Sequence, residues 1–143
     1  GWWEIFVERT RPLTYLTFWA ELAVTREPVV LQHAVNLLLH LGAVWLAFDC
    51  LTRLISHRAA VIAALIVAIH PLQGETVNYI WARSTLLMTV LCLLSLRVWT
   101  REHRWRAVAW FGLALLAKEE AVAFPLVLLL LRRDWKPAAA MWR

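Results

Sequence analysis

The stretch from His70 to Arg83, HPLQGETVNYIWAR, holds the densest group of side chains that could do chemistry. Within it Glu75, Tyr79 and Arg83 recur at intervals of four, which predicts that they share one face of a helix. A carboxylate can orient a hydroxyl or accept its proton, and the planar guanidinium of arginine suits a phosphate. The alternative is a structural ion pair between Glu75 and Arg83 that caps the helix. The residues alone leave both interpretations open.

A second charged group, Lys118, Glu119 and Glu120, interrupts an apolar stretch that runs from residue 107 to residue 131. The lysine could meet an anion while one of the carboxylates accepts a proton or orients a hydroxyl. The alternative is a solvated hairpin turn whose charges only mark the boundary with water. Three charges are more than such a boundary needs, because each costs about 2.5–3.5 kcal/mol near the centre of a membrane.

A third polar group, His33, Asn36 and His40, lies on one stripe of a long apolar segment. Two histidines could bind a metal, but their spacing is not i, i+4 and no carboxylate shares the stripe. Hydrogen bonding between helices is the interpretation that we adopt, so we predict no metal site here. The sequence also has no glycine-rich nucleotide loop, no GxSxG elbow and no HExxH motif.

The composition indicates which kind of fold must position these groups. The chain is 62% hydrophobic and 17% charged, with a mean hydropathy of +0.60, and a soluble domain of 143 residues would carry more charge. We therefore expect an all-α fold, a polytopic bundle of transmembrane helices with some short or broken helices, integral to the lipid bilayer. The basic residues behind the net charge of +5 cluster in short loops beside apolar segments, so we expect no nucleic-acid partner.

Residues 29–136 form the expected transmembrane core. Its elements are spans near 29–49, 59–71 and 84–99 and a hairpin over 107–131. The first span has about 20 apolar residues, enough to cross a hydrocarbon core about 30 Å thick. A hairpin keeps the charges of its tip away from the centre of the bilayer. Residues 1–28 are expected to form an outer-face loop and an interfacial helix, and residues 137–143 a truncated cytoplasmic tail.

The basic residues divide unevenly if these segments cross a bilayer in turn. Ten share one side: Arg53, Arg58, Arg97, Arg101, Arg104, Arg106, Arg132, Arg133, Lys136 and Arg143. Five share the other: Arg9, Arg11, Arg26, Arg83 and Lys118. Cytoplasmic loops carry the excess of Lys and Arg, so the side with ten is expected to face the cytoplasm. The candidate site residues then gather on the outer face.

Four ordered blocks, RPLTYLTF, LQHAVNLLLH, HPLQGETVNYIWARSTLL and LLAKEEAVAFP, cover roughly residues 9 to 131. In this order and at this spacing they resemble the membrane core of the transmembrane O-mannosyltransferases with tetratricopeptide repeats, the TMTC family, and their bacterial relatives. These proteins belong to the GT-C superfamily of glycosyltransferases. The residues that match the family's motifs are Arg11, His70, Pro71, Glu75, Arg83, Lys118 and Glu119.

The resemblance implies a membrane enzyme that moves mannose or a similar sugar from a polyprenyl-phosphate carrier to a hydroxyl of a protein or other acceptor, on the periplasmic or luminal side. On this basis we expect Arg83, Lys118 and Arg11 to bind the lipid phosphate. We expect Glu75, Glu119 and His70 to serve in catalysis. No cofactor is expected, since the lipid-linked sugar is a substrate, and a divalent metal requirement stays open.

Two features of the family pattern have no match here: an acidic motif in the first outer loop, and the repeat domain that follows the membrane core. We therefore expect this stretch alone to lack its catalytic base and to be inactive. The bias toward Ala, Leu, Arg and Trp favours a bacterial inner membrane, with the endoplasmic reticulum membrane as the location in a eukaryote.

Two other classes of function stay open. One is a transporter or proton-coupled protein in which His70, Glu75 and Glu119 form a relay. The other is a non-catalytic membrane scaffold whose polar residues only pair helices.

Overall fold

The computed structural model describes residues 11–25, 28–101 and 103–134, and over these residues the chain is helical with no strand. The all-α prediction is therefore confirmed. The helices are α2 (Pro12–Val24), α3 (Val29–Leu51), α4 (His57–Ile69), α5 (Pro71–Asn78), α6 (Arg83–Trp99), α7 (Arg104–Ala117) and α8 (Phe124–Asp134). Two short 3-10 helices, η1 (Ile80–Ala82) and η2 (Glu119–Ala123), precede α6 and α8.

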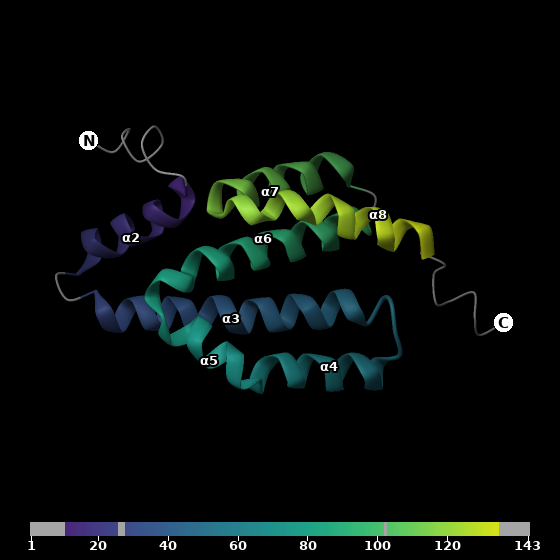
Figure 1. The fold of residues 1–143 in the computed structure, drawn as a ribbon, viewed down its shortest axis with the longest axis horizontal. Coiled ribbons are helices and arrows are strands. Elements are labelled where there is room, and N and C mark those ends of the chain that lie inside the picture. The colour runs from purple at the N-terminus through teal and green to yellow at the C-terminus, as the bar shows by residue number, and fades with distance from the viewer. Residues whose placement is uncertain (1–10, 26–27, 102, 135–143) are drawn as a thin grey trace.

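Local sequence explains where several helices begin and end. Pro12 occupies the first turn of α2, where its missing N–H costs nothing. The Ser56 side chain accepts a hydrogen bond from the Ala59 N–H and so caps the start of α4. Pro71 follows the last residues of α4 and forces a break, after which α5 starts in a new direction (Figure 1).

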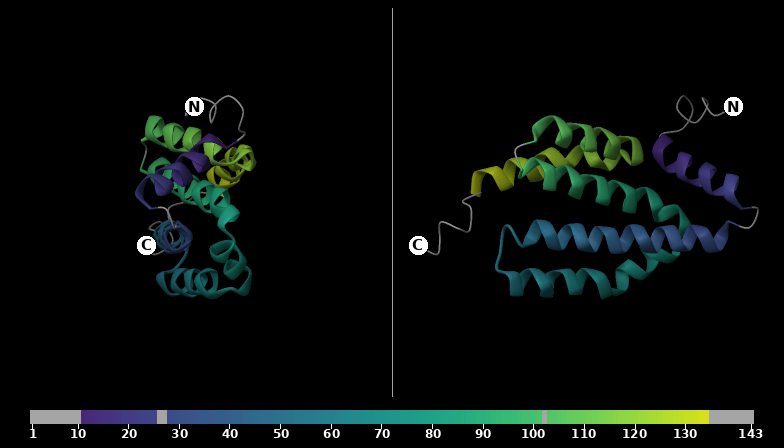
Figure 2. Two further views of the ribbon diagram at one scale, coloured as in Figure 1. Left: turned by 90° about the vertical axis from the view of Figure 1, so that its left-hand side faces the viewer. Right: turned by 180° about the vertical axis from the view of Figure 1, so that it is seen from behind.

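The helices form an elongated bundle with two parts (Figures 1 and 2). Antiparallel helices α3 and α4 make one part, and α6, α7 and α8 make the other, while α2 lies across one end. Helix α6 joins the parts because it packs against both α7 and α3. Small residues Ala107, Ala114 and Ala117 are buried along α7, which lets the helices approach closely.

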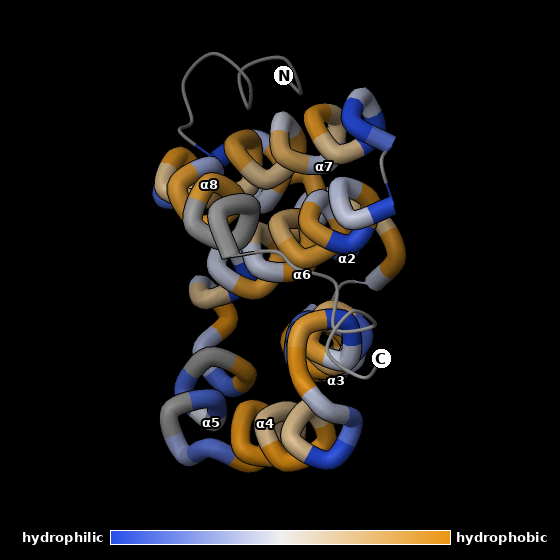
Figure 3. Tube along the Cα trace, turned by 90° about the vertical axis from the view of Figure 1, so that its right-hand side faces the viewer, coloured by the Kyte–Doolittle hydropathy of each residue, from blue (hydrophilic) through white to orange (hydrophobic). Residues whose placement is uncertain are grey.

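The outer surface of this bundle is apolar along the helices. Figure 3 shows hydrophobic residues over most of α3, α4 and α7, and large exposed side chains include Leu38, Trp45, Ile62, Leu65 and Leu126. By length and composition, Val29–Leu51 and Ile80–Trp99 are each suited to crossing a membrane, and α4 is a shorter apolar helix. An apolar surface of this extent is what a lipid environment requires.

The turns of the bundle lie at two opposite ends. The α3–α4 and α6–α7 turns lie at one end, and α2, η1 and η2 lie at the other (Figure 1). At the end with the α3–α4 and α6–α7 turns, Asp49 Oδ2 lies 3.0 Å from Arg53 Nη2 and 3.0 Å from Arg97 Nε. The Arg97 Nε–H group is not aligned for a hydrogen bond. Which end faces the cytoplasm stays a prediction, as does the crossing of the membrane by each segment.

The expected hairpin over 107–131 corresponds to α7 and α8, which run in opposite directions and meet at η2 (Figure 1). Other expectations lie outside the described residues. These are the tail over 137–143, the first part of the outer loop over 1–10, and Arg9, Arg26, Lys136 and Arg143 of the charge count.

The prediction that Glu75, Tyr79 and Arg83 share one helix face was wrong. Helix α5 ends at Asn78, and Tyr79 has an extended backbone with φ −84° and ψ 108° before η1 begins. Glu75 therefore lies on α5 while Arg83 opens α6. The last turn of α5 contains Asn78, which favours helix ends because its side chain competes for backbone hydrogen bonds.

Candidate functional site

The first part of the site is an ion pair between Arg11 and Glu119. Arg11 is the N-cap residue of α2 and Glu119 begins η2. Arg11 Nη2 donates to Glu119 Oε1 at 2.6 Å and Nε donates to Oε2 at 3.1 Å, so the contact is bidentate. The remaining nitrogen, Nη1, lies 3.4 Å from Ser84 Oγ in the first turn of α6. This one guanidinium thus connects the starts of three elements.

The pair keeps Glu119 ionised. The hydrogen bond from Arg11, a backbone hydrogen bond and the nearby charges of Arg11 and Lys118 lower the pKa of Glu119 to about 2. In turn, the hydrogen bond to Glu119 raises the pKa of Arg11 above its ordinary value. A carboxylate with so low a pKa is a weak base, so Glu119 is better suited to orienting cations or hydroxyls than to taking a proton.

Lys118 completes this group from the end of α7. Its Nζ donates to Thr85 Oγ1 at 3.1 Å and lies 2.9 Å from Glu120 Oε1. The Lys118 side chain is 14% exposed, whereas that of Glu120 is 62% exposed. Thr14 Oγ1 donates to the Ala117 carbonyl at 3.0 Å and anchors α2 beside this lysine. We call Arg11, Ser84, Thr85, Lys118, Glu119 and Glu120 the polar cluster.

Arg83 lies next to the polar cluster but is fully buried. Its Nη1 donates to Glu21 Oε1 at 2.5 Å and its Nε donates to Asn36 Oδ1 at 2.9 Å. Its Nη2 donates to the Gln32 carbonyl at 2.8 Å, and its Cζ lies 4.4 Å above the centre of the Phe18 ring. The guanidinium therefore ties α6 to both α2 and α3.

The expectation that Arg83 binds the lipid phosphate stays a prediction, and the contacts of its side chain bear on it. With 0% of the residue exposed and every nitrogen donating to protein, the guanidinium is closed to a ligand in this structure. The alternative interpretation, a structural ion pair, fits better, but its partner is Glu21 and not Glu75. Burial of a charge is stable only when it is paired and hydrogen-bonded, and Glu21, Asn36 and Gln32 meet that need.

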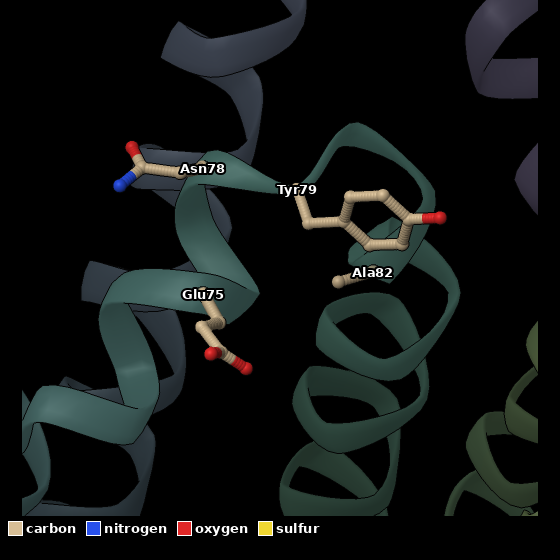
Figure 4. Close-up of a pocket in the computed structure, with 4 residues that line it drawn as sticks. All are labelled: Glu75, Asn78, Tyr79 and Ala82. Carbon is tan, nitrogen blue, oxygen red and sulfur yellow. The ribbon is translucent and has the colours of Figure 1, made fainter.

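Glu75 lies apart from the polar cluster, on α5. Within the described parts of the chain its carboxylate has no hydrogen-bond or ion-pair partner, and it lines a cavity of about 520 Å³ with Asn78, Tyr79 and Ala82. Figure 4 shows the carboxylate directed toward the gap between α5 and α6, and the Tyr79 ring beside Ala82. An exposed, unpaired carboxylate at the rim of a cavity is available to a ligand.

His70 lies at the junction of α4 and α5 as the C-cap residue of α4, and it is exposed. It shares this part of the fold with Glu75, whose helix packs against α3 and α4. The six predicted site residues thus occupy three places: Arg11, Lys118 and Glu119 in the polar cluster, Arg83 buried beside it, and His70 and Glu75 along α5. Among the described residues, no group of three His, Cys, Asp or Glu is placed to hold a metal ion.

The profile of glycosyltransferase family 87 matches residues 11–142, nearly the whole chain. The chain belongs to glycosyltransferase family 87. It is 33% identical over 119 residues to the protein O-mannosyl-transferase F38B6.6 of Caenorhabditis elegans, covering 78% of this chain and 17% of that protein.

A second relative of this family member is the human (Homo sapiens) protein O-mannosyl-transferase TMTC3. The two are 27% identical over 114 residues, which is 79% of this chain and 12% of the human protein. The chain thus spans less than a fifth of the length of these curated relatives. No solved structure significantly matches the family 87 chain. The expected resemblance to the O-mannosyltransferases is confirmed.

Several residues of the family 87 chain were not predicted to contact the candidate residues. Ser84 contacts Arg11, Thr85 contacts Lys118, and Glu21 contacts Arg83. In the sequence, only the residue type could have indicated these contacts. Glu21, for example, is a lone acidic residue in an apolar segment, and a buried acid needs a partner. The predicted hydrogen bonding between helices is confirmed for two residues: Asn36 Nδ2 donates to the Val77 carbonyl at 3.4 Å, and His40 Nε2 lies 3.3 Å from the Ala68 carbonyl.

Proposed function

We propose that this chain is part of a membrane glycosyltransferase that transfers a sugar such as mannose from a polyprenyl-phosphate donor to a hydroxyl of a protein or similar acceptor. The polar cluster carries the proposal, because it places Lys118 and Arg11 together at one end of a bundle whose helices expose a largely apolar surface. The named activity of the two curated relatives supports it. The polar end is proposed to face the periplasm or lumen, opposite the arginine-rich turns.

A lipid-linked phosphate suits this arrangement for two reasons. The apolar surface of the helices can contact the polyprenyl chain within the membrane. The cations of Lys118 and Arg11 then lie at the end of the bundle, where the phosphate of such a lipid would reside. Ammonium and guanidinium groups both bind phosphate strongly, the latter in two-point contacts. Glu119 and Glu120 hold these cations in position until the phosphate takes over part of their hydrogen bonding.

The chemical step forms a bond from the acceptor oxygen to the anomeric carbon and breaks the bond from that carbon to the phosphate oxygen. The polyprenyl phosphate leaves with the bonding electrons, so negative charge grows on it in the transition state. Lys118 and Arg11 stabilise that charge. The acceptor hydroxyl loses its proton to a carboxylate or imidazole, and of the described residues we assign Glu75 to orient this hydroxyl, with His70 nearby along α5.

The experiment is a direct binding measurement on the full-length protein purified in detergent. The probe is polyprenyl-phosphate mannose, and the variant is Lys118→Gln, which removes a charge while keeping most of the side chain. Loss of one charge-assisted phosphate contact should weaken binding about tenfold or more. The matched control is Arg58→Gln, an exposed cation in the first turn of α4 at the opposite end of the bundle. Absence of wild-type binding, or equal binding by both variants, would contradict the proposal.

A further inference from the structure

A second cavity, of about 570 Å³, lies between α2, the start of α3 and the break from α5 to η1. Its lining consists of Tyr15, Phe18, Gln32, His33, Asn78, Tyr79, Ile80 and Trp81. Its volume falls within the range of about 300–1,000 Å³ that is typical of small-molecule sites. No role has been assigned to this cavity by the function proposed above. We call it the aromatic pocket.

The lining combines aromatic rings with neutral hydrogen-bonding groups. Tyr79 and Trp81 are 62% and 60% exposed, so their ring faces are open to a ligand. Within the described parts of the chain, the side chains of Gln32, His33 and Asn78 have no hydrogen-bond partner. Amide and imidazole groups can each donate and accept, as can a hydroxyl group. No Asp, Glu, Lys or Arg side chain is part of the described lining.

This chemistry matches a hexopyranose better than a charged ligand. A pyranose ring presents C–H groups on its faces, which pack on aromatic rings, and hydroxyls around its rim, which need partners that both donate and accept. A purely apolar ligand would leave Gln32, His33 and Asn78 without partners at a cost in free energy. An anion would meet no fixed positive charge among the lining residues.

The walls of the pocket are held in place by the buried ion pair. The Phe18 and Trp81 rings meet edge to face, with 5.9 Å between their centres. Arg83 lies on the Phe18 ring, and Glu21 and Asn36 fix Arg83 in turn. A pocket whose walls are set before binding loses less entropy when a ligand enters. Arg83 thus helps to position this wall through its contact with the Phe18 ring.

The pocket also borders both parts of the proposed site. Tyr15 lies one helical turn, about 6 Å along the axis, from Arg11 of the polar cluster. Trp81 lies three positions before Ser84, which contacts Arg11. On the other side Asn78 and Tyr79 line the cavity of Glu75 as well (Figure 4). A ligand in the aromatic pocket would therefore be next to the Glu75 cavity and close to the helix turn that carries Arg11.

We infer that the aromatic pocket binds the sugar ring of the lipid-linked donor, a neutral hexopyranose, with Tyr79 and Trp81 against its faces and Asn78, Gln32 and His33 at its hydroxyls. This inference rests on the proposed function and adds the sugar subsite to it. The subsite orients the anomeric carbon between its phosphate leaving group and the acceptor hydroxyl.

The test compares two probes on the full-length protein by calorimetric titration. One is citronellyl phosphate mannose, a short-chain lipid-linked sugar, and the other is citronellyl phosphate, which lacks the sugar. Trp81→Ala should weaken binding of the mannose probe about tenfold and leave binding of the sugar-free probe unchanged. Asn78→Ala, at an exposed position, should weaken only the mannose probe by severalfold. Trp105→Ala is the control, since Trp105 is 87% exposed at the start of α7.

The outcomes separate this inference from the proposed function. Lys118→Gln should weaken both probes, and if it weakens neither, the proposed phosphate site fails. Should Trp81→Ala and Asn78→Ala weaken both probes equally, or neither, the aromatic pocket is not the sugar subsite, and an interfacial role for the tryptophan in the membrane explains its exposure. An effect confined to the KM of an acceptor peptide would also overturn the inference, because it would place the acceptor in this pocket.

Discussion

Arg11 and Glu119 are 108 positions apart in the sequence, yet their side chains form a bidentate ion pair with contacts of 2.6 and 3.1 Å. The pair is partly exposed, with 35% of the Arg11 side chain and 58% of the Glu119 side chain accessible. Exposed pairs contribute only about 0–1 kcal/mol to stability. The importance of this contact is geometric, because it fixes the tip of the α7–α8 hairpin against the start of α2.

The pH dependence of stability should reveal this pair. In the folded state Arg11 lowers the pKa of Glu119 from the ordinary 4.5 to about 2. A lowered pKa means that the stabilisation is complete above pH 4.5 and is lost as the pH falls toward 2. The difference in Tm between wild type and Glu119→Gln should therefore stay constant between about pH 5 and pH 8 and shrink only below that range.

Arg11→Gln provides the control for this pH series, because it removes the cause of the lowered pKa. Its Tm difference from Arg11→Gln/Glu119→Gln should be small at every pH. A gap between wild type and Glu119→Gln that closes near neutral pH would show that Glu119 is not held by Arg11.

The buried pair of Arg83 and Glu21 should have a much larger effect on stability. Its side chains are 0% and 7% exposed, and removal of one partner leaves a buried charge uncompensated. Arg83→Gln or Glu21→Gln should each lower the free energy of unfolding by about 3–5 kcal/mol, measured as a lower Tm or midpoint of denaturation for the full-length protein in detergent.

A double variant separates the charge effect from lost packing. Arg83→Met with Glu21→Leu removes both charges and should recover most of the Tm, because two apolar groups replace a pair that was costly to desolvate. If Arg83→Gln alone leaves the Tm at the wild-type value, Arg83 and Glu21 do not form a buried ion pair.

Much of the fold could be predicted from the lengths of the apolar segments. The segments 29–49 and 84–99, expected as membrane spans, lie within helices α3 and α6, because a long apolar run in lipid must satisfy its backbone hydrogen bonds internally. Their crossing of a membrane stays a prediction. The break at Tyr79 could not be predicted from spacing, since Glu75, Tyr79 and Arg83 fit helical periodicity. Tertiary contacts decide it: Asn36 bonds to the Val77 carbonyl, and Arg83 is drawn into its buried pair.

The site was predictable to a similar degree. Counting basic residues on each side of the expected spans placed Arg11, Arg83 and Lys118 on one side, and Arg11 and Lys118 do lie in the polar cluster with Glu119. Their roles in function stay predictions. The partner of Arg83 was not predictable, because Glu21 is 62 positions away and nothing in local spacing connects them. The aromatic pocket combines residues of four separate elements, so it emerges only when the helices are packed.

Packing between α6 and α7 can be tested with a pair of substitutions on one helix. Ala114 is 0% exposed in the core formed with Leu91, while Ala109 is exposed on the same helix. Ala114→Leu should cost about 1–3 kcal/mol because the larger side chain separates closely packed helices, and Ala109→Leu should be nearly neutral. Thermal denaturation of the two variants measures the difference. Equal Tm values would mean that α7 does not pack on α6 through this face.

Thr85 on α6 helps to hold the Lys118 side chain in place. Thr85 Oγ1 accepts a hydrogen bond from Lys118 Nζ, so Thr85→Val removes the acceptor while keeping the shape of the side chain. Loss of one such bond should raise the KM for the lipid-linked donor about two- to tenfold with little change in Tm. Thr89→Val is the matched control, because its hydroxyl bonds only to the Thr85 carbonyl within the same helix. If both variants raise KM equally, the cause lies in the backbone of α6, and Thr85 does not position the lysine for phosphate.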